Sequence, residues 1–146
     1  MRKINYIVVH CSATREGCTL TSEALEAEHR RRGFRTTGYH YYIRRDGTVL
    51  GTRSLELPGA HCRGHNKYSI GICYEGGLDA RGNPKDTRTP EQRSALHLLV
   101  YQLLQQFRNA RVCGHRDLSP DLDGDGPVEP WEWVKQCPCF EVSKEF

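Results

Sequence analysis

The sequence predicts an α/β fold, because short apolar runs of strand length are interspersed with segments of helical periodicity. Two such runs, over 5–10 and 69–75, are rich in β-branched residues and are predicted to be buried strands. Apolar residues recur at helical spacing behind a strong start signal over 89–107. With 146 residues, of which 37% are hydrophobic, the chain has the length and core of one domain, and we expect 1–146 to form it.

Two helices carry recognisable start signals. The segment 21–32 begins with hydroxyl residues, has acidic residues early and three arginines in its last turn, and is followed by Gly33. This charge order suits the helix dipole, so the arginines are interpreted as a solvated last turn and not as a binding patch. The helix over 89–107 begins with Thr89-Pro90, and Gln92 completes a capping box. Its apolar face is predicted to pack on the sheet.

The remaining elements are shorter. A hairpin over 39–53 is predicted to close through a two-residue turn at Asp46-Gly47. The segment 54–67 lacks periodicity and is predicted to be a polar loop. A short strand over 111–113 and a short helix over 130–135 complete the set.

Composition excludes some classes of function. The net charge of +3 comes from basic residues spread along the chain, which allows a weak preference for anionic polymers but gives no nucleic-acid footprint. No stretch approaches the length of a membrane span. The apolar run over 6–9 is too short for a secretory signal, so we expect synthesis in the cytoplasm without a cleavable leader.

Seven cysteines are present: Cys11, Cys18, Cys62, Cys73, Cys113, Cys137 and Cys139. Because the number is odd and no signal precedes them, mostly free thiols plus one metal thiolate is the more economical interpretation. Strand alternation predicts that Cys11 and Cys113 are packing residues, facing away from the histidines beside them. Cys139 could be mistaken for the ligand or could pair with another thiol, and we favour Cys137.

The segment 111–140 is where the chemistry is expected, because it concentrates His115, Lys135 and Cys137. Histidine and cysteine both ligate zinc, and a hydrolytic zinc site needs three protein ligands and one open position. His10, at the end of the first predicted strand, is the best candidate for the third ligand. Taken alone, His10 fits a core histidine equally well, and Cys137 fits a buried small hydrophobe. Lys135 favours the ligand interpretation, since a nearby cation stabilises a thiolate.

Four pieces of sequence stand in an informative order. They are IVVHCSAT at 7–14, GYHYYIRRDGTV at 38–49, GAHCRGHNKYSIGICYEGG at 59–77, and GHRD with KQCPCF at 114–117 and 135–140. Together they resemble the zinc-dependent N-acetylmuramoyl-L-alanine amidases of type 2, a family that includes amidase-type phage lysozymes and peptidoglycan recognition proteins. The resemblance covers nearly the whole chain.

The resemblance implies a central mixed sheet flanked by helices and a zinc site at the edge of a peptidoglycan groove. By position, the zinc ligands fall on His10, His115 and Cys137. The active-site tyrosine and lysine of the family fall on Tyr39 and Lys135, and a groove histidine falls on His61. For Tyr39, Lys135 and His61, a packing aromatic, a solvated cation and a solvated loop residue are the respective alternatives.

The loop 121–132 matches a calcium-binding template that lies outside the core pattern of the family. Its oxygen ligands would be Asp121, Asp123, Asp125 and Glu132, with Gly126 at the tight turn. In this interpretation calcium has a structural role, fixing the segment that carries Lys135 and Cys137. Against it, no proper helix precedes the loop, and Asp/Gly-rich turns also occur without any ion.

The expected activity is hydrolysis of the amide between N-acetylmuramic acid and L-alanine in peptidoglycan, by a monomer that reaches the cell wall after release or export. The alternative is a peptidoglycan-binding module without catalysis, but such relatives typically lack the ligand cysteine that this chain has. A calcium-stabilised interaction domain is a third interpretation, and it leaves His10, Tyr39 and Lys135 without a role.

Overall fold

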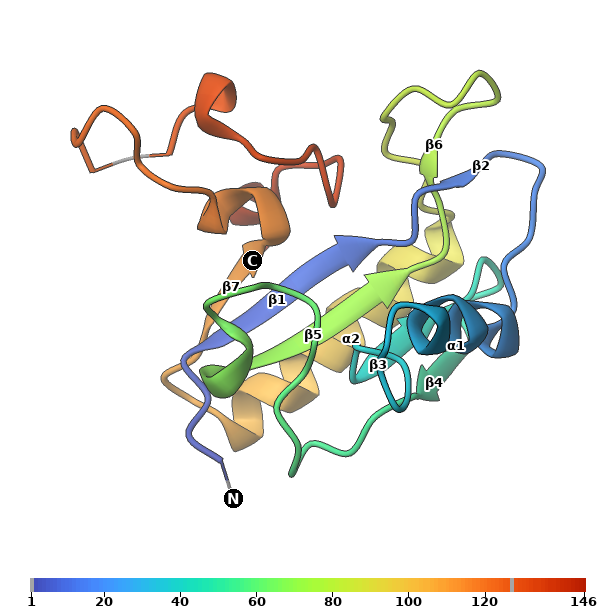
Figure 1. The fold of residues 1–146 in the computed structure, drawn as a ribbon, viewed down its shortest axis with the longest axis horizontal. Helices are drawn as coiled ribbons and strands as arrows, with labels where there is room; N and C mark the ends of the chain where they lie inside the picture. The colour runs from blue at the N-terminus through green and yellow to red at the C-terminus, as the bar shows by residue number, and fades with distance from the viewer. Residues whose placement is uncertain (1, 127) are drawn as a thin grey trace.

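The computed structural model describes residues 2–126 and 128–146 and contains a five-stranded mixed sheet. Its strand order is β4 (Val49–Gly51), β3 (Tyr41–Ile43), β5 (Ser69–Tyr74), β1 (Tyr6–Cys11) and β7 (Arg111–Gly114). All neighbouring strands are parallel except β4, which is antiparallel at one edge. A small parallel pair, β2 (Thr14–Arg15) and β6 (Gly77–Leu78), follows β1 and β5 (Figure 1). The predicted α/β fold with a mixed sheet is confirmed.

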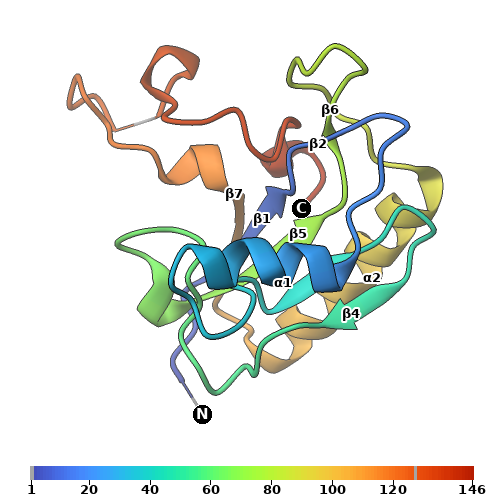
Figure 2. The same cartoon turned by 45° about the vertical axis from the view of Figure 1, so that its right-hand side comes forward.

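Two helices cover opposite faces of the sheet, as Figure 2 shows. They are α1 (Ser22–Arg31) and α2 (Pro90–Gln106), and both begin where the sequence predicts. The Thr21 hydroxyl accepts a hydrogen bond from the Ala24 amide, and Thr89 and Gln92 form the predicted capping box. The described residues also form four short 3₁₀ turns: η1 (Asn66–Tyr68), η2 (His115–Leu118), η3 (Pro130–Glu132) and η4 (Val142–Lys144).

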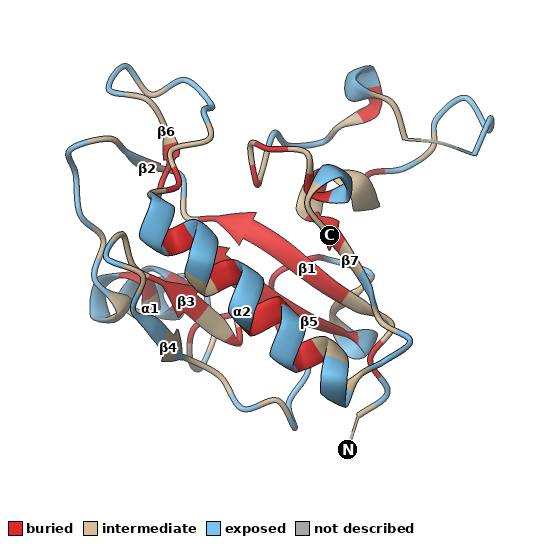
Figure 3. Ribbon diagram, turned by 180° about the vertical axis from the view of Figure 1, so that it is seen from behind, coloured by how far each residue is buried: buried red, intermediate tan, exposed pale blue. Residues whose placement is uncertain are grey.

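The core lies between the sheet and α2, where a buried stripe of the helix faces the strands (Figure 3). Alternate strand residues fill it: Ile7, Val9 and Cys11 from β1, and Ile70, Ile72 and Tyr74 from β5. Each fully buried aliphatic side chain contributes roughly 1.5–3 kcal/mol. The intervening residues, His10 of β1 and Gly71 and Cys73 of β5, therefore point to the other face, and the functional groups gather there.

The C-terminal segment lies above the sheet and is fastened to the start of α2 (Figure 1). The Arg88 side chain is completely buried and donates to both carboxylate oxygens of Glu145, at 2.9 and 2.6 Å. It also donates to Asp86 and lies 3.4 Å from the centre of the Phe140 ring. One guanidinium thus joins two carboxylates and an aromatic ring, and it holds the end of the chain in place.

Two local predictions were wrong. The hairpin closes through three residues, because the Arg44 amide bonds to the Thr48 carbonyl and Gly47 adopts a left-handed φ of 88°. The predicted helix over 130–135 is only the η3 turn. The Glu132 carboxylate accepts the Glu129 amide, and the turn ends at Trp133, which has an extended backbone.

Replacing Arg88 with methionine is expected to lower the free energy of unfolding by about 3 kcal/mol, because two carboxylates would lose their buried partner. Urea denaturation measures this. Arg93 is the matched control, since it also donates to Asp86 but its side chain is 48% exposed. Arg93→Met should cost less than about 1 kcal/mol. Equal losses for the two variants would contradict a tether centred on Arg88.

Candidate metal centre

Strand register brings the two candidate histidine ligands together. β1 and β7 are parallel, and Val9 is paired with Gly114. The next residue in each case is a histidine, His10 within β1 and His115 directly after β7, so the two side chains lie next to each other with ring centres 4.7 Å apart. The η2 turn begins at His115, and the Asp117 carboxylate holds that turn by accepting the Gly114 amide at 2.8 Å.

Cys137 reaches the same place from the C-terminal segment. Its sulfur accepts the Cys11 amide at 3.1 Å, at the end of β1. The following residue, Pro138, packs directly on Gly114 and its carbonyl accepts the Tyr74 hydroxyl at 2.6 Å. Because a side chain at 114 would overlap the proline ring, this glycine lets the segment approach β7 closely enough to deliver the thiol.

One ligand atom from each of His10, His115 and Cys137 lies within 4.8 Å of the others. His10 is 1% exposed. Burial holds the pKa of His10 well below its usual range, and the neighbouring His61, His115 and Lys135 side chains lower it further, so the imidazole is neutral. A neutral imidazole is the form that binds a metal ion. Two imidazoles and a sulfur in this arrangement match the donor set of a hydrolytic zinc site.

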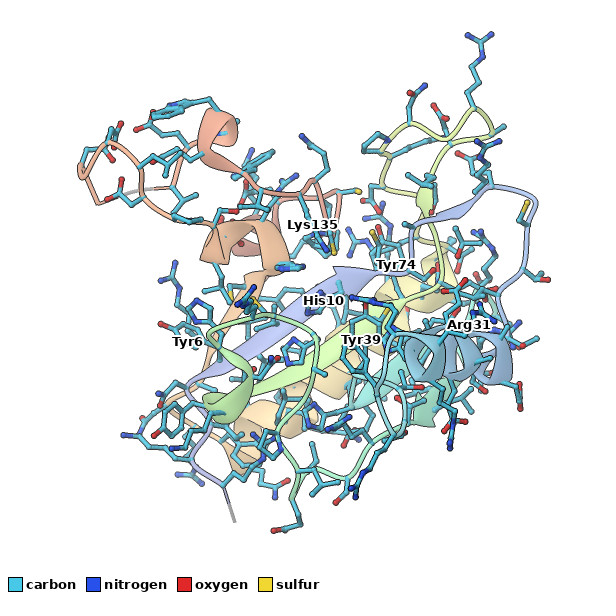
Figure 4. The ribbon with its side chains drawn as sticks, in the orientation of Figure 1. Tyr6, His10, Arg31, Tyr39, Tyr74 and Lys135 are labelled. Atoms are coloured by element: carbon cyan, nitrogen blue, oxygen red, sulfur yellow. The ribbon has the colours of Figure 1, made fainter. Side chains whose placement is uncertain are left out.

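Tyr39 and Lys135 flank the three donors, and Figure 4 shows both near His10. The Tyr39 ring centre lies 5.0 Å from that of His10. Burial and the surrounding thiols hold the pKa of Tyr39 well above its usual range, so the phenol keeps its proton. Lys135 is exposed and lines the groove beside the donors.

Tyr39 is oriented by a residue that the sequence did not single out. The His29 ring of α1 lies 5.3 Å from the Tyr39 ring, and its Nδ1 accepts the Gly38 amide at 2.7 Å. Unbroken strand alternation would place Tyr39 and Tyr42 on opposite faces, but Tyr39 precedes β3 and packs on the same cluster as Tyr42. Since residue 39 lies outside the strand, the alternation does not extend to it.

His61 contacts the candidate ligand His10 and also lines the groove. It is 9% exposed, and both of its ring nitrogens have partners. Nδ1 lies 2.8 Å from Nε2 of His10, and Nε2 lies 3.1 Å from the Ser69 hydroxyl. The predicted contact of His61 with substrate stays a prediction. Ser69 was missed, because a serine that opens a strand carries no sequence signal of its own.

A groove that His61, His115 and Lys135 help to line carries an excess of positive charge. Its charged lining side chains are Arg32, Arg63, Arg111 and Lys135 against Asp117 and Glu141. Such a groove favours a ligand with anionic groups.

The candidate cysteines are placed as predicted except for Cys113. None of the seven forms a disulfide. Cys11 is buried in the core under α2, as predicted. The prediction that Cys113 faces away from the histidines was wrong, because Cys113 is paired with Val8 on the His10 face and lines the groove beside His115. The Cys139 sulfur lies 3.9 Å from that of Cys11 and donates to the Gly77 carbonyl, so it is directed away from the ligand position taken by Cys137.

The acidic side chains of the loop lie close together, and residue 127 within it lies outside the described residues. Carboxylate oxygens of Asp121, Asp123, Asp125 and Glu132 lie within 4.8 Å of one another. Glu132 is buried and accepts the amides of Leu122, Asp123 and Glu129. Hydrogen bonding to Glu129, with the other acids nearby, raises the pKa of Asp125 to about 7. The loop therefore concentrates negative charge, and the hydrogen bonds of Glu132 to its backbone amides fix its conformation.

Comparisons with known proteins agree with this geometry. A family model described as N-acetylmuramoyl-L-alanine amidase matches residues 1–138. An endolysin of Klebsiella phage KP32 is 35% identical over 143 residues, which are 98% of this chain and 85% of the relative. The N-acetylmuramoyl-L-alanine amidase LysC from Clostridium intestinale is 26% identical, with a TM-score of 0.76 over 99% of this chain and 82% of that chain. The peptidoglycan recognition protein SA of Apis mellifera shares the fold at 21% identity, with a TM-score of 0.73 over 99% and 81% of the two chains.

The chain therefore belongs to the N-acetylmuramoyl-L-alanine amidase family, which the resemblance of its motifs predicted. The predicted class of enzyme, an amidase that hydrolyses peptidoglycan, is confirmed with it. Among the described residues, no helix is long and apolar enough to span a bilayer.

Replacing Gly114 with alanine is expected to weaken metal binding by at least tenfold, because the new Cβ would lie 2.6 Å from the Pro138 ring and push Cys137 away. Titration with Co²⁺, followed by its thiolate absorption band, measures the affinity. The control is Gly51→Ala in β4, where a Cβ meets nothing within 4 Å. Unchanged cobalt affinity in Gly114→Ala would show that Cys137 does not depend on this close approach.

Proposed function

We propose that this amidase is zinc-dependent and cleaves the amide between the lactyl group of N-acetylmuramic acid and the L-alanine of the stem peptide. The observation that carries the proposal is the convergence of His10, His115 and Cys137 beside an open groove. The positive excess in that groove suits a stem peptide, which carries carboxylates. We assign the whole of 1–146 to one amidase domain, with the C-terminal segment supplying the third ligand.

His10, His115 and Cys137 would hold the zinc ion. When bound, such an ion acts as a Lewis acid on a carbonyl and lowers the pKa of water toward neutrality. His10 is already neutral in its buried position, and the Cys137 sulfur already accepts an amide hydrogen bond, so both are prepared as electron-pair donors.

Tyr39 and Lys135 act on the reacting amide. The ammonium group of Lys135 stabilises the negative charge that develops on the carbonyl oxygen during attack by water. The protonated Tyr39 hydroxyl donates a hydrogen bond to the attacking water or to the same oxygen. A single donor of this kind typically lowers the barrier by about 3 kcal/mol. The leaving amine takes its proton from one of these two groups or from a water between them.

Chelation should abolish the release of stem peptide from purified sacculi, and added zinc should restore it, because the reaction depends on the bound ion. Cys137→Ser should lose both zinc, measured by atomic emission, and activity. Cys18→Ser is the control, since Cys18 is an exposed free thiol between β2 and α1 and is not part of the donor cluster. Full zinc content and full cleavage by Cys137→Ser would overturn the ligand assignment.

Tyr39→Phe and Lys135→Met should each lower kcat by about 10²-fold while zinc content stays at the wild-type level, since each removes a donor to the transition state and not a ligand. Steady-state hydrolysis of a defined muropeptide gives kcat. Tyr41→Phe is the control for Tyr39, because Tyr41 packs against the α2 core. A wild-type kcat in either variant would show that the replaced residue has no role in the reaction.

The rival function, a peptidoglycan-binding module without catalysis, predicts that sacculi retain the protein but release no free stem peptide. Mass spectrometry of the digested wall separates the two functions. The complete His/His/Cys donor set is the feature that favours the enzyme.

Calcium binding by 121–132 stays a prediction. If calcium occupies the loop, adding it should raise the melting temperature of the protein by several degrees and protect the loop from proteolysis. Asp123→Asn should abolish both effects without loss of zinc. Identical melting in calcium and in a calcium chelator would leave the loop as an Asp/Gly turn held by Glu132.

Monomeric state and action on the wall after release or export are also part of the proposal. The similarity to phage endolysins supports the site of action. Sedimentation of the purified protein tests the oligomeric state.

A further inference from the structure

Three side chains form a hydrogen-bonded line from the metal centre into the sheet. It begins at His10 of β1, passes through His61 of the loop between β4 and β5, and ends at Ser69, the first residue of β5. Its two links measure 2.8 and 3.1 Å. The three side chains are all buried, so water does not compete for these bonds.

The His61 ring occupies a slot that the sequence has shaped for it. A Cβ at Gly59 would lie 2.4 Å from the ring, and a Cβ at Gly71 would lie 2.6 Å from it. Any side chain at either position would displace the imidazole. The Asn66 side chain adds a second restraint, since its oxygen accepts the amides of His61 and Cys62 at 2.9 Å. The ring is therefore fixed in both position and angle.

This line determines which nitrogen of His10 faces a metal ion. A neutral imidazole has one N–H donor and one acceptor nitrogen. Nε2 of His10 is bonded to His61, so Nδ1 remains as the metal-ligating nitrogen. Nε2 then carries the hydrogen and donates it to Nδ1 of His61, whose own hydrogen lies on Nε2 and is donated to the Ser69 hydroxyl. Every nitrogen in the line has one role.

We propose that His61, oriented by Ser69, is a positioning residue that fixes the tautomer and ring angle of His10 and thereby raises metal affinity. The inference rests on the proposed ligand role of His10. It differs from the expected role of His61 as a contact for substrate. Outer partners of this kind commonly change metal affinity by 10- to 100-fold.

The test measures zinc affinity by competition with a chromogenic chelator. His61→Ala should weaken zinc binding by about 10- to 100-fold. His61→Gln, whose side-chain oxygen can accept from Nε2 of His10, should recover part of that loss. Ser69→Ala should cause a smaller loss than His61→Ala. His65→Ala is the matched control, because His65 lines the same groove from the same loop but packs edge-on to Tyr6, and its zinc affinity should be unchanged.

A second readout separates the two roles of His61. A positioning residue changes the zinc dissociation constant and leaves the KM for muropeptide, measured at saturating zinc, unchanged. A substrate contact raises KM and leaves zinc affinity unchanged, and that result would overturn the proposal. Failure of wild-type protein to bind zinc would instead overturn the proposed function.

A measurement on the unaltered protein guards against variants that do not fold. Nitrogen-15 NMR of the zinc-loaded protein reports which ring nitrogens carry hydrogen. The expected result is hydrogen on Nε2 of both His10 and His61. Hydrogen on Nδ1 of His10 would overturn the proposal.

Discussion

β1 lies between two parallel neighbours, and the hydrogen bonds of this three-strand unit determine where the two candidate histidine ligands lie. The pairing of Val9 with Gly114 places His10 beside His115, and the β1–β5 pairing places Gly71 one row below, next to Val8. A shift of one residue in either pairing would turn His10 toward the α2 core. The chemistry thus depends on strand register more than on any single side-chain contact.

The apolar core under α2 stabilises that register. On the opposite face, the buried histidines make the stability of the fold depend on pH. Burial lowers the pKa of His40 to about 4 and that of His61 to about 3, while His10 is also held neutral. Each of these residues binds a proton more readily in the unfolded chain, so protonation below neutral pH favours unfolding. The face that carries the functional groups is therefore the acid-sensitive face of the protein.

Much of this arrangement could be predicted from the sequence, because strong local signals agree with the fold. Thr89, Pro90 and Gln92 start α2 where the capping rules place a helix, and the strand ending at His10 has an apolar pattern that only a buried strand explains. The meeting of His10, His115 and Cys137 was suggested by residue type and motif order, since no local rule links positions so far apart.

The missed features are those that depend on tertiary contacts. Gly71 leaves room for the His61 ring, which the loop before β5 places against the strand. A glycine in a predicted strand does not show which side chain will pack against it. The η3 turn replaces a predicted helix because the Glu132 side chain competes for backbone amides. The hairpin loop gains a residue through the left-handed Gly47.

The proposed donors lie far apart in the sequence, with His10 in β1 and Cys137 in the segment that Arg88 holds in place. During translation, a ribosome-bound chain lacks the sulfur donor until synthesis has passed that cysteine. If the proposed ligands are correct, the complete donor set is therefore absent from nascent and prematurely terminated products that stop before Cys137, and wall-cleaving capacity arises only in chains extended beyond it.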